Sequence, residues 1–202
     1  QESPDGNFPT CPFPNPEIRQ AFEEAIALAA AMEPRADLLL ATDPDCDRVG
    51  IAVLHEGEYR LLTGNEVGAM LLDYILAGRK EKETLPAQPM AVKTIVTSPL
   101  ADRVAAKYGC QVVNVLTGFK YIGEQIALLE AKEEAARFVF GFEESYGYLA
   151  GGYVRDKDAV VASMLICEMA AYYKAQGKTL LDVVEDLYQE HGMILCTQRS
   201  YT

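Results

Sequence analysis

Residues 43–48 read Asp-Pro-Asp-Cys-Asp-Arg, so one short loop carries three carboxylates at alternate positions and ends in an arginine. Two carboxylates held about 4 Å apart repel each other by roughly 4 kcal/mol at an effective dielectric constant near 20, and a cation between them offsets that repulsion. We refer to residues 43–48 as the acidic loop and expect Asp43, Asp45 and Asp47 to bind a metal ion. The alternative is a solvated acidic turn that Arg48 neutralises.

The sequence around the acidic loop separates the possible metals. A calcium-binding helix-loop-helix needs glycine at loop position six and glutamate at position twelve, where this chain has Arg48 and Leu54. Pro44 prevents a helix from running through the loop, and the short apolar segments 38–41 and 49–54 on either side favour strands. Oxygen ligands between two strands favour Mg²⁺, and the guanidinium of Arg48 suits the oxygens of a phosphate bound beside the metal.

Composition restricts the class of protein. The chain has 202 residues, of which 50% are hydrophobic, which is enough for one α/β domain and part of another. Its net charge of −12 argues against partners such as nucleic acid or an anionic membrane. The five cysteines form no Cys-x-x-Cys pair, which suits a reducing compartment, and no stretch reads as a signal peptide or a membrane span. We therefore expect a cytoplasmic protein.

Apolar periodicity alternates between strand-like and helix-like segments, which predicts an α/β fold. Strands are expected at residues 38–41, 49–54, 59–62, 91–96, 111–115 and 137–140. Helices are expected at residues 16–32 with Asn15 as N-cap, after a capping box at 63–66, from 98 to 109, from 117 to about 134, at 158–175 and at 179–190. The segment 91–115 is then a βαβ unit, whose two strands should be parallel with a right-handed crossover.

Ligands of open parallel sheets gather beyond the carboxyl ends of the strands, and two further segments follow predicted strands. Thr117-Gly118-Phe119-Lys120 opens a helix, so its free backbone N–H groups and its lysine could hold an anion. Equally, Thr117 could serve only as the N-cap of that helix.

The second segment, residues 141–148, reads Gly-Phe-Glu-Glu-Ser-Tyr-Gly-Tyr and is too polar for a core. Its carboxylates and hydroxyl are suitable acceptors for vicinal sugar hydroxyls, although a Glu-Glu pair is often only a solvated turn. We refer to residues 143–147 as the Glu-Glu-Ser loop. Residues 155–158, Arg-Asp-Lys-Asp, come next, where Asp156 or Asp158 could be only a helix cap and the basic residues its solvated partners.

Five segments together resemble the α-D-phosphohexomutase superfamily, and within it the bacterial phosphoglucomutases: PDGNFPTCPFPNPE, TDPDCDRVGIAV, LTGNEVGAMLLDYI, TGFKYIGE and GFEESYGYLAGGYVRDKDAV. Family members have four domains, so the resemblance implies that this chain is a fragment. Residues 1–58 would be the C-terminal part of domain 2, and 59–190 would be domain 3, with an open mixed or parallel sheet and flanking helices. Residues 191–202 would form a hinge toward domain 4, and domains 1 and 4 would lie outside the chain.

The resemblance also implies a reaction. A phosphoserine would donate its phosphoryl group to a hexose 1-phosphate, and the resulting glucose 1,6-bisphosphate would reorient and return its other phosphoryl group to the serine. Asp43, Asp45 and Asp47 would hold Mg²⁺, and Arg48 would offset charge on the transferring group. No serine of this chain lies in the Thr-Ala-Ser-His type of pattern that surrounds the phosphoserine, so we expect it outside the fragment.

By the same resemblance, Glu143 and Ser145 would bind the sugar hydroxyls, and Thr117 would line the same pocket. Lys157 would handle phosphate charge or the hydroxyl proton. Glu144 favours glucose, because members with other specificities tend to replace this glutamate, but mannose phosphates remain possible substrates. Pro44 departs from the glycine of many relatives and should stiffen the acidic loop without removing a ligand.

Two other classes remain open from the residues. In an aspartyl-phosphate phosphatase, Asp43 would be the nucleophile and Asp45 the acid, but such loops usually continue to threonine rather than to Asp47 and Arg48. A non-catalytic module that binds magnesium or a sugar phosphate would describe the fragment alone. We expect the isolated chain to fold, to lack mutase activity, and to expose a sheet edge through which it could dimerise.

Overall fold

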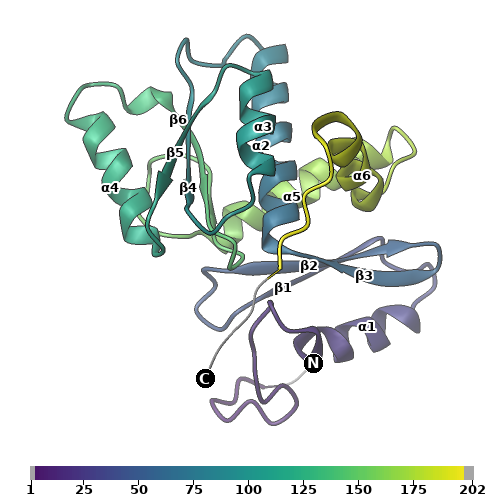
Figure 1. Ribbon diagram of the computed structural model, residues 1–202. Coiled ribbons are helices and arrows are strands. Elements are labelled where there is room, and N and C mark those ends of the chain that lie inside the picture. Colours follow the sequence, from purple (N-terminus) through teal and green to yellow (C-terminus); the bar gives the residue numbers. More distant parts are fainter. Residues whose placement is uncertain (1–2, 198–202) are drawn as a thin grey trace.

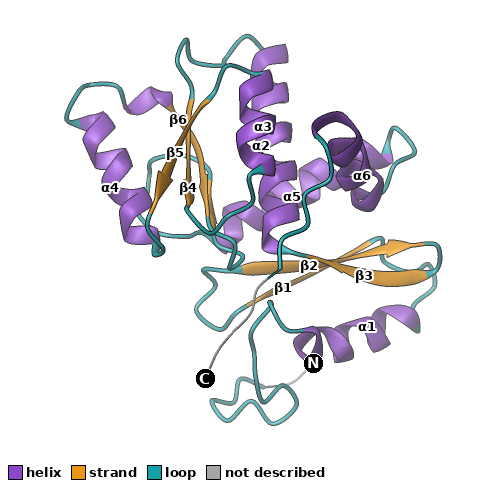
Figure 2. Cartoon of the chain, in the orientation of Figure 1, coloured by secondary structure: helices purple, strands orange, loops and turns teal. Residues whose placement is uncertain are grey.

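The computed structural model describes residues 3–197 and contains two separate β-sheets with helices packed around them (Figure 1). The first sheet is antiparallel, in the order β1-β2-β3, and the second has the order β5-β4-β6-β7 (Figure 2). The strands are β1 (Leu38–Thr42), β2 (Val49–His55), β3 (Glu58–Leu62), β4 (Met90–Thr94), β5 (Gln111–Val115), β6 (Phe138–Phe142) and β7 (Tyr148–Leu149). Residues 198–202 of the predicted hinge lie outside the described residues.

The helices separate and cover these sheets. They are η1 (Arg19–Phe22), α1 (Glu23–Ala30), α2 (Gly64–Glu81), α3 (Leu100–Lys107), α4 (Phe119–Glu130), η2 (Ala135–Arg137), α5 (Ala159–Lys174) and α6 (Leu180–His191). In Figure 1, α2 and α3 lie on one face of the second sheet and α4 on the other. The first sheet lies between α1 and the pair α5 and α6. Within residues 3–197, no helix combines the length and the apolar character that crossing a membrane requires.

The second sheet is the mixed sheet that the sequence predicts. β4 runs parallel to both β5 and β6, and only the short β7 is antiparallel, so the predicted βαβ unit of β4, α3 and β5 is confirmed in its strand direction. α2 begins where predicted, because Thr63 and Glu66 exchange the two hydrogen bonds of a capping box. Close packing follows at Gly68, where a Cβ atom would lie 2.2 Å from the ring of Phe142.

The predicted helix at 16–32 was wrong in its first half. Ile18 is extended, a 3₁₀ turn follows, and the α-helix begins only at Glu23. The side chain of Asn15 accepts a hydrogen bond from the backbone N–H of Glu17 (2.9 Å), which closes a local turn rather than capping a helix. This turn presses the Pro16 carbonyl so close to Gly50 that a Cβ there would lie 2.6 Å from it.

The reading of Thr117 as an N-cap was also wrong. Gly118 occupies that position with φ +115°, and no side chain caps the helix. β4 ends at Thr94 rather than at residue 96, where the strand was predicted to end. The Thr97 N–H donates to the Thr94 carbonyl (3.0 Å), which closes a turn directly after Thr94. By contrast, Asp158 does cap its helix, accepting from the N–H groups of Val160 and Val161.

Candidate functional site

The acidic loop is the connection of an antiparallel hairpin. β1 and β2 pair up to Thr42 and Val49, and the Asp43 N–H donates to the Arg48 carbonyl (3.3 Å) at the base of the loop. Cys46 takes the left-handed conformation with φ +58° at the tip. A strand-loop-strand frame is therefore present as predicted, and its short span leaves little freedom to the side chains between the strands.

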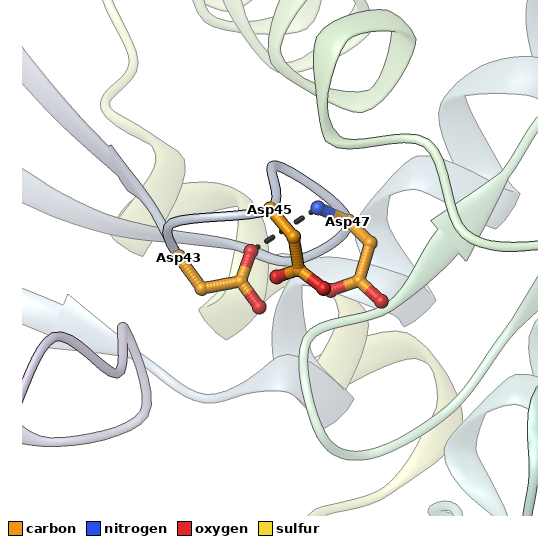
Figure 3. A group of neighbouring side chains, drawn as sticks. All are labelled: Asp43, Asp45 and Asp47. Atoms are coloured by element: carbon orange, nitrogen blue, oxygen red, sulfur yellow. Dashed lines mark hydrogen bonds between the residues drawn. The ribbon is translucent and has the colours of Figure 1, made fainter. Parts of the chain in front are cut away.

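The three carboxylates of this loop converge, as Figure 3 shows. Each of Asp43, Asp45 and Asp47 offers an oxygen within 4.8 Å of those of the other two. Backbone geometry produces this arrangement, because one oxygen of Asp43 accepts from the N–H groups of Asp47 (3.1 Å, dashed in Figure 3) and Arg48 (3.0 Å). Burial raises the pKa of Asp43; the Arg48 N–H lowers it in part, and the neighbouring carboxylates of Asp47 and Asp45 raise it further.

The residues present fit a magnesium ion. All three candidate ligands are hard oxygen donors, which is the ligand type that Mg²⁺ prefers. Within the described residues, Oδ1 of Asp47 is buried and has no hydrogen-bond partner, as expected for an acceptor that a cation completes. The loop opens onto a pocket of ≈ 240 Å³, lined by Phe13, Pro14, Asn15, Asp43, Pro44, Asp45, Asp47 and Arg48.

Arg48 lies at the wall of this pocket. Its Nη1 pairs with Oε1 of Glu17 (3.1 Å), while its Nε lies 3.8 Å from Asp43 and 3.9 Å from Asp47. This Nε is buried and, among residues 3–197, makes no hydrogen bond. The Nε side of the guanidinium thus faces the carboxylates, and the exposed part of the side chain is where an anionic oxygen could bind.

The Glu-Glu-Ser loop lies directly against the acidic loop. Val49 N–H donates to the Tyr146 carbonyl (3.2 Å), and Arg48 forms an isolated antiparallel bridge with Gly147. The Glu-Glu-Ser loop is itself closed by a hydrogen bond from the Glu143 N–H to the Gly147 carbonyl (3.0 Å). Two segments that are about 100 residues apart in the sequence therefore lie side by side.

Lys157 joins these two loops. Its Nζ lies 2.8 Å from Oδ2 of Asp47 and 2.9 Å from Oδ1 of Asp156. Burial alone would lower the pKa of Lys157, but the two carboxylates outweigh burial and raise it, so the amine stays charged. The side chain of Lys157 packs closely over Gly147. A Cβ atom on Gly147 would lie 2.7 Å from Cγ and Cδ of Lys157 and 2.8 Å from Oε1 of Glu143.

The carboxylate of Glu143 is almost enclosed, with 8% of the residue exposed. Burial raises its pKa, while the nearby Lys157 charge and a hydrogen bond from Ser145 oppose that rise. Burial also tends to raise the pKa of Asp47, yet the Lys157 ammonium, a hydrogen bond with Asp43 and the Arg48 charge together hold it below its usual value. Glu143, Ser145, Lys157 and Asp47 are thus coupled electrostatically.

Thr117 is exposed. The nearest described link is Phe119, two residues later, whose ring centroid lies 5.8 Å from Nζ of Lys157. Sequence reasoning missed Glu17 and Gly147. Nothing in the spacing marks Glu17, whereas a glycine within a polar loop after a strand does signal close approach of another group.

Comparison with known proteins gives concordant results over the whole chain. The family model for phosphoglucomutase/phosphomannomutase, alpha/beta/alpha domain III, matches residues 63–191, and the model for domain II matches residues 1–57. A phosphoglucomutase of Staphylococcus aureus is 39% identical over 203 aligned positions that cover 100% of this chain and 35% of that protein. One from Staphylococcus epidermidis is 41% identical over 95% of this chain and 34% of that protein.

Among solved structures, a putative phosphomannomutase from Thermus thermophilus superposes with a TM-score of 0.66 at 26% identity, covering 89% of this chain and 36% of that one. The chain spans about a third of the length of the curated relatives it matches. Both family models match, and together they cover nearly all of the residues that form the two sheets and the two loops. The chain belongs to the phosphoglucomutase/phosphomannomutase family.

Proposed function

We propose that the full-length protein interconverts glucose 1-phosphate and glucose 6-phosphate, and that this chain supplies its metal loop and its sugar loop. The observation that carries the proposal is the position of Lys157, which lies 2.8 Å from Asp47 of the acidic loop and packs over Gly147 of the Glu-Glu-Ser loop. A phosphate and a sugar joined in one substrate need these two kinds of group side by side.

The acidic loop would serve the phosphoryl group. Asp43, Asp45 and Asp47 would hold Mg²⁺, which supplies positive charge to a transition state whose charge is spread over the phosphoryl oxygens. The side chain of Arg48 is 36% exposed beside these carboxylates, and its guanidinium would donate to one of the phosphoryl oxygens. Lys157 would neutralise phosphate charge, and because its raised pKa keeps the amine protonated, it would not also accept the proton of the attacking hydroxyl.

The Glu-Glu-Ser loop would bind the sugar. Glu143 and Ser145 would hydrogen-bond vicinal hydroxyls in both orientations of the substrate, and Thr117 would line the outer part of the pocket. Glucose 1,6-bisphosphate would be the intermediate, and a phosphoserine outside this chain would donate and recover the phosphoryl group. We infer preference for glucose over mannose from Glu144.

The proposal includes the organisation of the protein. Residues 1–58 would end domain 2, 59–190 would form domain 3, and 191–202 would lead to domain 4. The enzyme would be cytoplasmic, with no nucleic acid or membrane partner. The 202-residue chain alone would bind magnesium without turnover, since the phosphoserine lies elsewhere.

Phosphorus NMR of the full-length protein tests this function. With glucose 1-phosphate, Mg²⁺ and a trace of glucose 1,6-bisphosphate, we expect glucose 6-phosphate to form without free phosphate. The Asp45→Asn variant should lose the conversion, and isothermal titration should show that it no longer binds Mg²⁺. Accumulation of free phosphate would instead make Asp43 the nucleophile of a phosphatase.

A further inference from the structure

The two glutamates of the Glu-Glu-Ser loop have separate surroundings. Glu143 lies beside Gly147 and close enough to Lys157 for their charges to interact. Glu144 instead reaches the end of β4, where its Oε2 accepts a hydrogen bond of 2.8 Å from the hydroxyl of Thr94. The second glutamate therefore contacts the body of the domain rather than the groups that would meet the substrate.

Thr94 is held by a second hydroxyl. Its Oγ1 lies 2.6 Å from Oγ1 of Thr97, and the two residues are 0% and 3% exposed. Each hydroxyl has one proton to donate. Because the Thr94 hydroxyl donates its hydrogen bond to Glu144, the Thr97 hydroxyl must donate to Thr94. The result is a directed chain of hydrogen bonds from Thr97 through Thr94 to the carboxylate of Glu144.

The turn that carries these threonines is itself rigidly supported. The buried Lys93 donates to the Thr97 carbonyl (3.3 Å) and pairs with Asp102 (3.2 Å). The next residue, Ser98, donates its N–H to the side chain of Asn65 (2.8 Å) at the start of α2. The hydroxyl of Thr94 therefore presents Glu144 with a fixed donor.

The backbone of Glu144 is confined as well. Gly64, the first residue of α2, lies so near that a Cβ atom on it would be 2.1 Å from the Glu144 carbonyl oxygen and 2.9 Å from the Tyr146 nitrogen. Side chain and backbone are thus fixed from two elements, β4 and α2. The neighbours of Glu144 on either side, Glu143 and Ser145, are the groups that would bind sugar.

We propose that Glu144, anchored by Thr94, is a positioning residue that fixes the position and orientation of the Glu143 and Ser145 side chains at the site. The inference rests on the proposed function, because it assigns those two residues to the sugar. Thr94 and Glu144 then control the affinity for the hexose part of the substrate without touching it. Asp43, Asp45 and Asp47 belong to another hairpin, which meets the Glu-Glu-Ser loop at Tyr146 and Gly147 rather than at Glu144.

The matched pair Thr94→Val and Thr94→Ser tests the inference in the full-length protein. Valine keeps the shape and loses the hydroxyl, whereas serine keeps the hydroxyl. For Thr94→Val we expect KM for glucose 1-phosphate to rise about tenfold, with a smaller change in kcat and an unchanged Mg²⁺ concentration for half-maximal rate. Thr94→Ser should stay within about twofold of the wild type. Loss of folded protein alone would lower the apparent kcat and leave KM unchanged.

A second variant, Glu144→Leu, removes the acceptor of the same hydrogen bond and serves if Thr94→Val does not fold. It should raise KM to a similar extent, and the double variant Thr94→Val/Glu144→Leu should be no worse than either single one, since both remove one interaction. A wild-type KM in the folded variant, or equal impairment by Thr94→Ser and Thr94→Val, would overturn the inference.

Amide hydrogen exchange separates this inference from the proposed function. If the wild-type protein shows no mutase activity, the proposed function fails, but exchange at residues 143–147 still reports on the anchor. Faster exchange there in Thr94→Val than in Thr94→Ser supports the anchor, and equal exchange in the two variants contradicts it. Exchange at residues 51–55 of β2, which pair with β1 and β3, is the internal control and should be the same in both.

Discussion

Two glycines of α2 should respond with opposite signs to the same substitution. In a helix interior, alanine in place of glycine restricts the unfolded chain and stabilises the helix by about 0.5–1 kcal/mol. At Gly78 the added Cβ would meet nothing within 4 Å, so we expect Gly78→Ala to gain that amount in free energy of unfolding. Gly68 lies ten residues earlier in the same helix and has the same intrinsic gain available.

At Gly68 a steric cost outweighs this gain. The new Cβ would lie 2.2 Å from Cδ2 and Cε2 of Phe142 and 3.0 Å from its Cγ. The ring cannot easily move away, because Phe142 is 1% exposed and stacks on Phe140 with centroids 5.4 Å apart. Overpacking a core typically costs about 1–3 kcal/mol. Taking the upper part of that range, we expect Gly68→Ala to be destabilised by about 1–2 kcal/mol net.

Urea unfolding of the 202-residue protein, followed by circular dichroism, measures both changes. The midpoint should move up for Gly78→Ala and down for Gly68→Ala, with similar slopes in both. If Gly68→Ala were as stable as Gly78→Ala, the close contact between α2 and β6 would not exist as described. A third variant, Gly68→Ala with Phe142→Leu, should recover part of the loss, because leucine vacates the ring volume.

Three further results are expected. Burial raises the pKa of the Cys110 thiol to about 11, so a thiol reagent at pH 8 should label the exposed Cys167 at least tenfold faster than Cys110 in peptide mapping. Asp158→Ala should cost about 1 kcal/mol in urea unfolding at pH 7, whereas Asp158→Asn should keep the cap. Burial raises the pKa of Asp158, but bonds from Tyr153 and two backbone N–H groups outweigh it and lower the pKa below 3.8. The part of the wild-type advantage over alanine that depends on the negative charge should therefore be complete above about pH 5 and be lost as the pH falls below 3.8, while the part that Asp158→Asn also keeps should remain. Lys157→Met should tighten Mg²⁺ binding in isothermal titration, since it removes a positive charge 2.8 Å from Asp47, and weaker binding would contradict this.

Local sequence patterns predicted correctly those elements whose conformation depends on neighbouring residues alone. Thr63 and Glu66 predicted the start of α2, because a capping box needs only four consecutive residues. The acidic loop was placed correctly between two strands, since Pro44 and the short apolar segments exclude a helix there. The prediction failed at 16–22, where Pro16 packs against Gly50 of β2. Such a contact has no signature in the local sequence.

The composition of the site illustrates the same limit. No spacing rule brings residues 43–48 next to 143–147, and the sequence analysis joined them only through the resemblance to a family. The structure joins them through a bridge between Arg48 and Gly147 and through the pairing of Lys157 with Asp47. These links depend on how the strands of the first sheet lie relative to the loop after β6 of the second sheet, which no local stretch of the sequence determines.

The adjacent pair Glu143 and Glu144 shows why residue type alone does not assign a role. They are the same residue type at adjacent positions, and the sequence motif that resembles the family includes both in one loop. The burial of Glu143 beside Lys157 and the bond from Thr94 to Glu144 separate them. Specificity that follows the second glutamate need not arise from contact with the sugar. It can arise from a change in the position of Glu143 and Ser145, and substitutions at Thr94, on a different strand, should then alter sugar affinity in the same way.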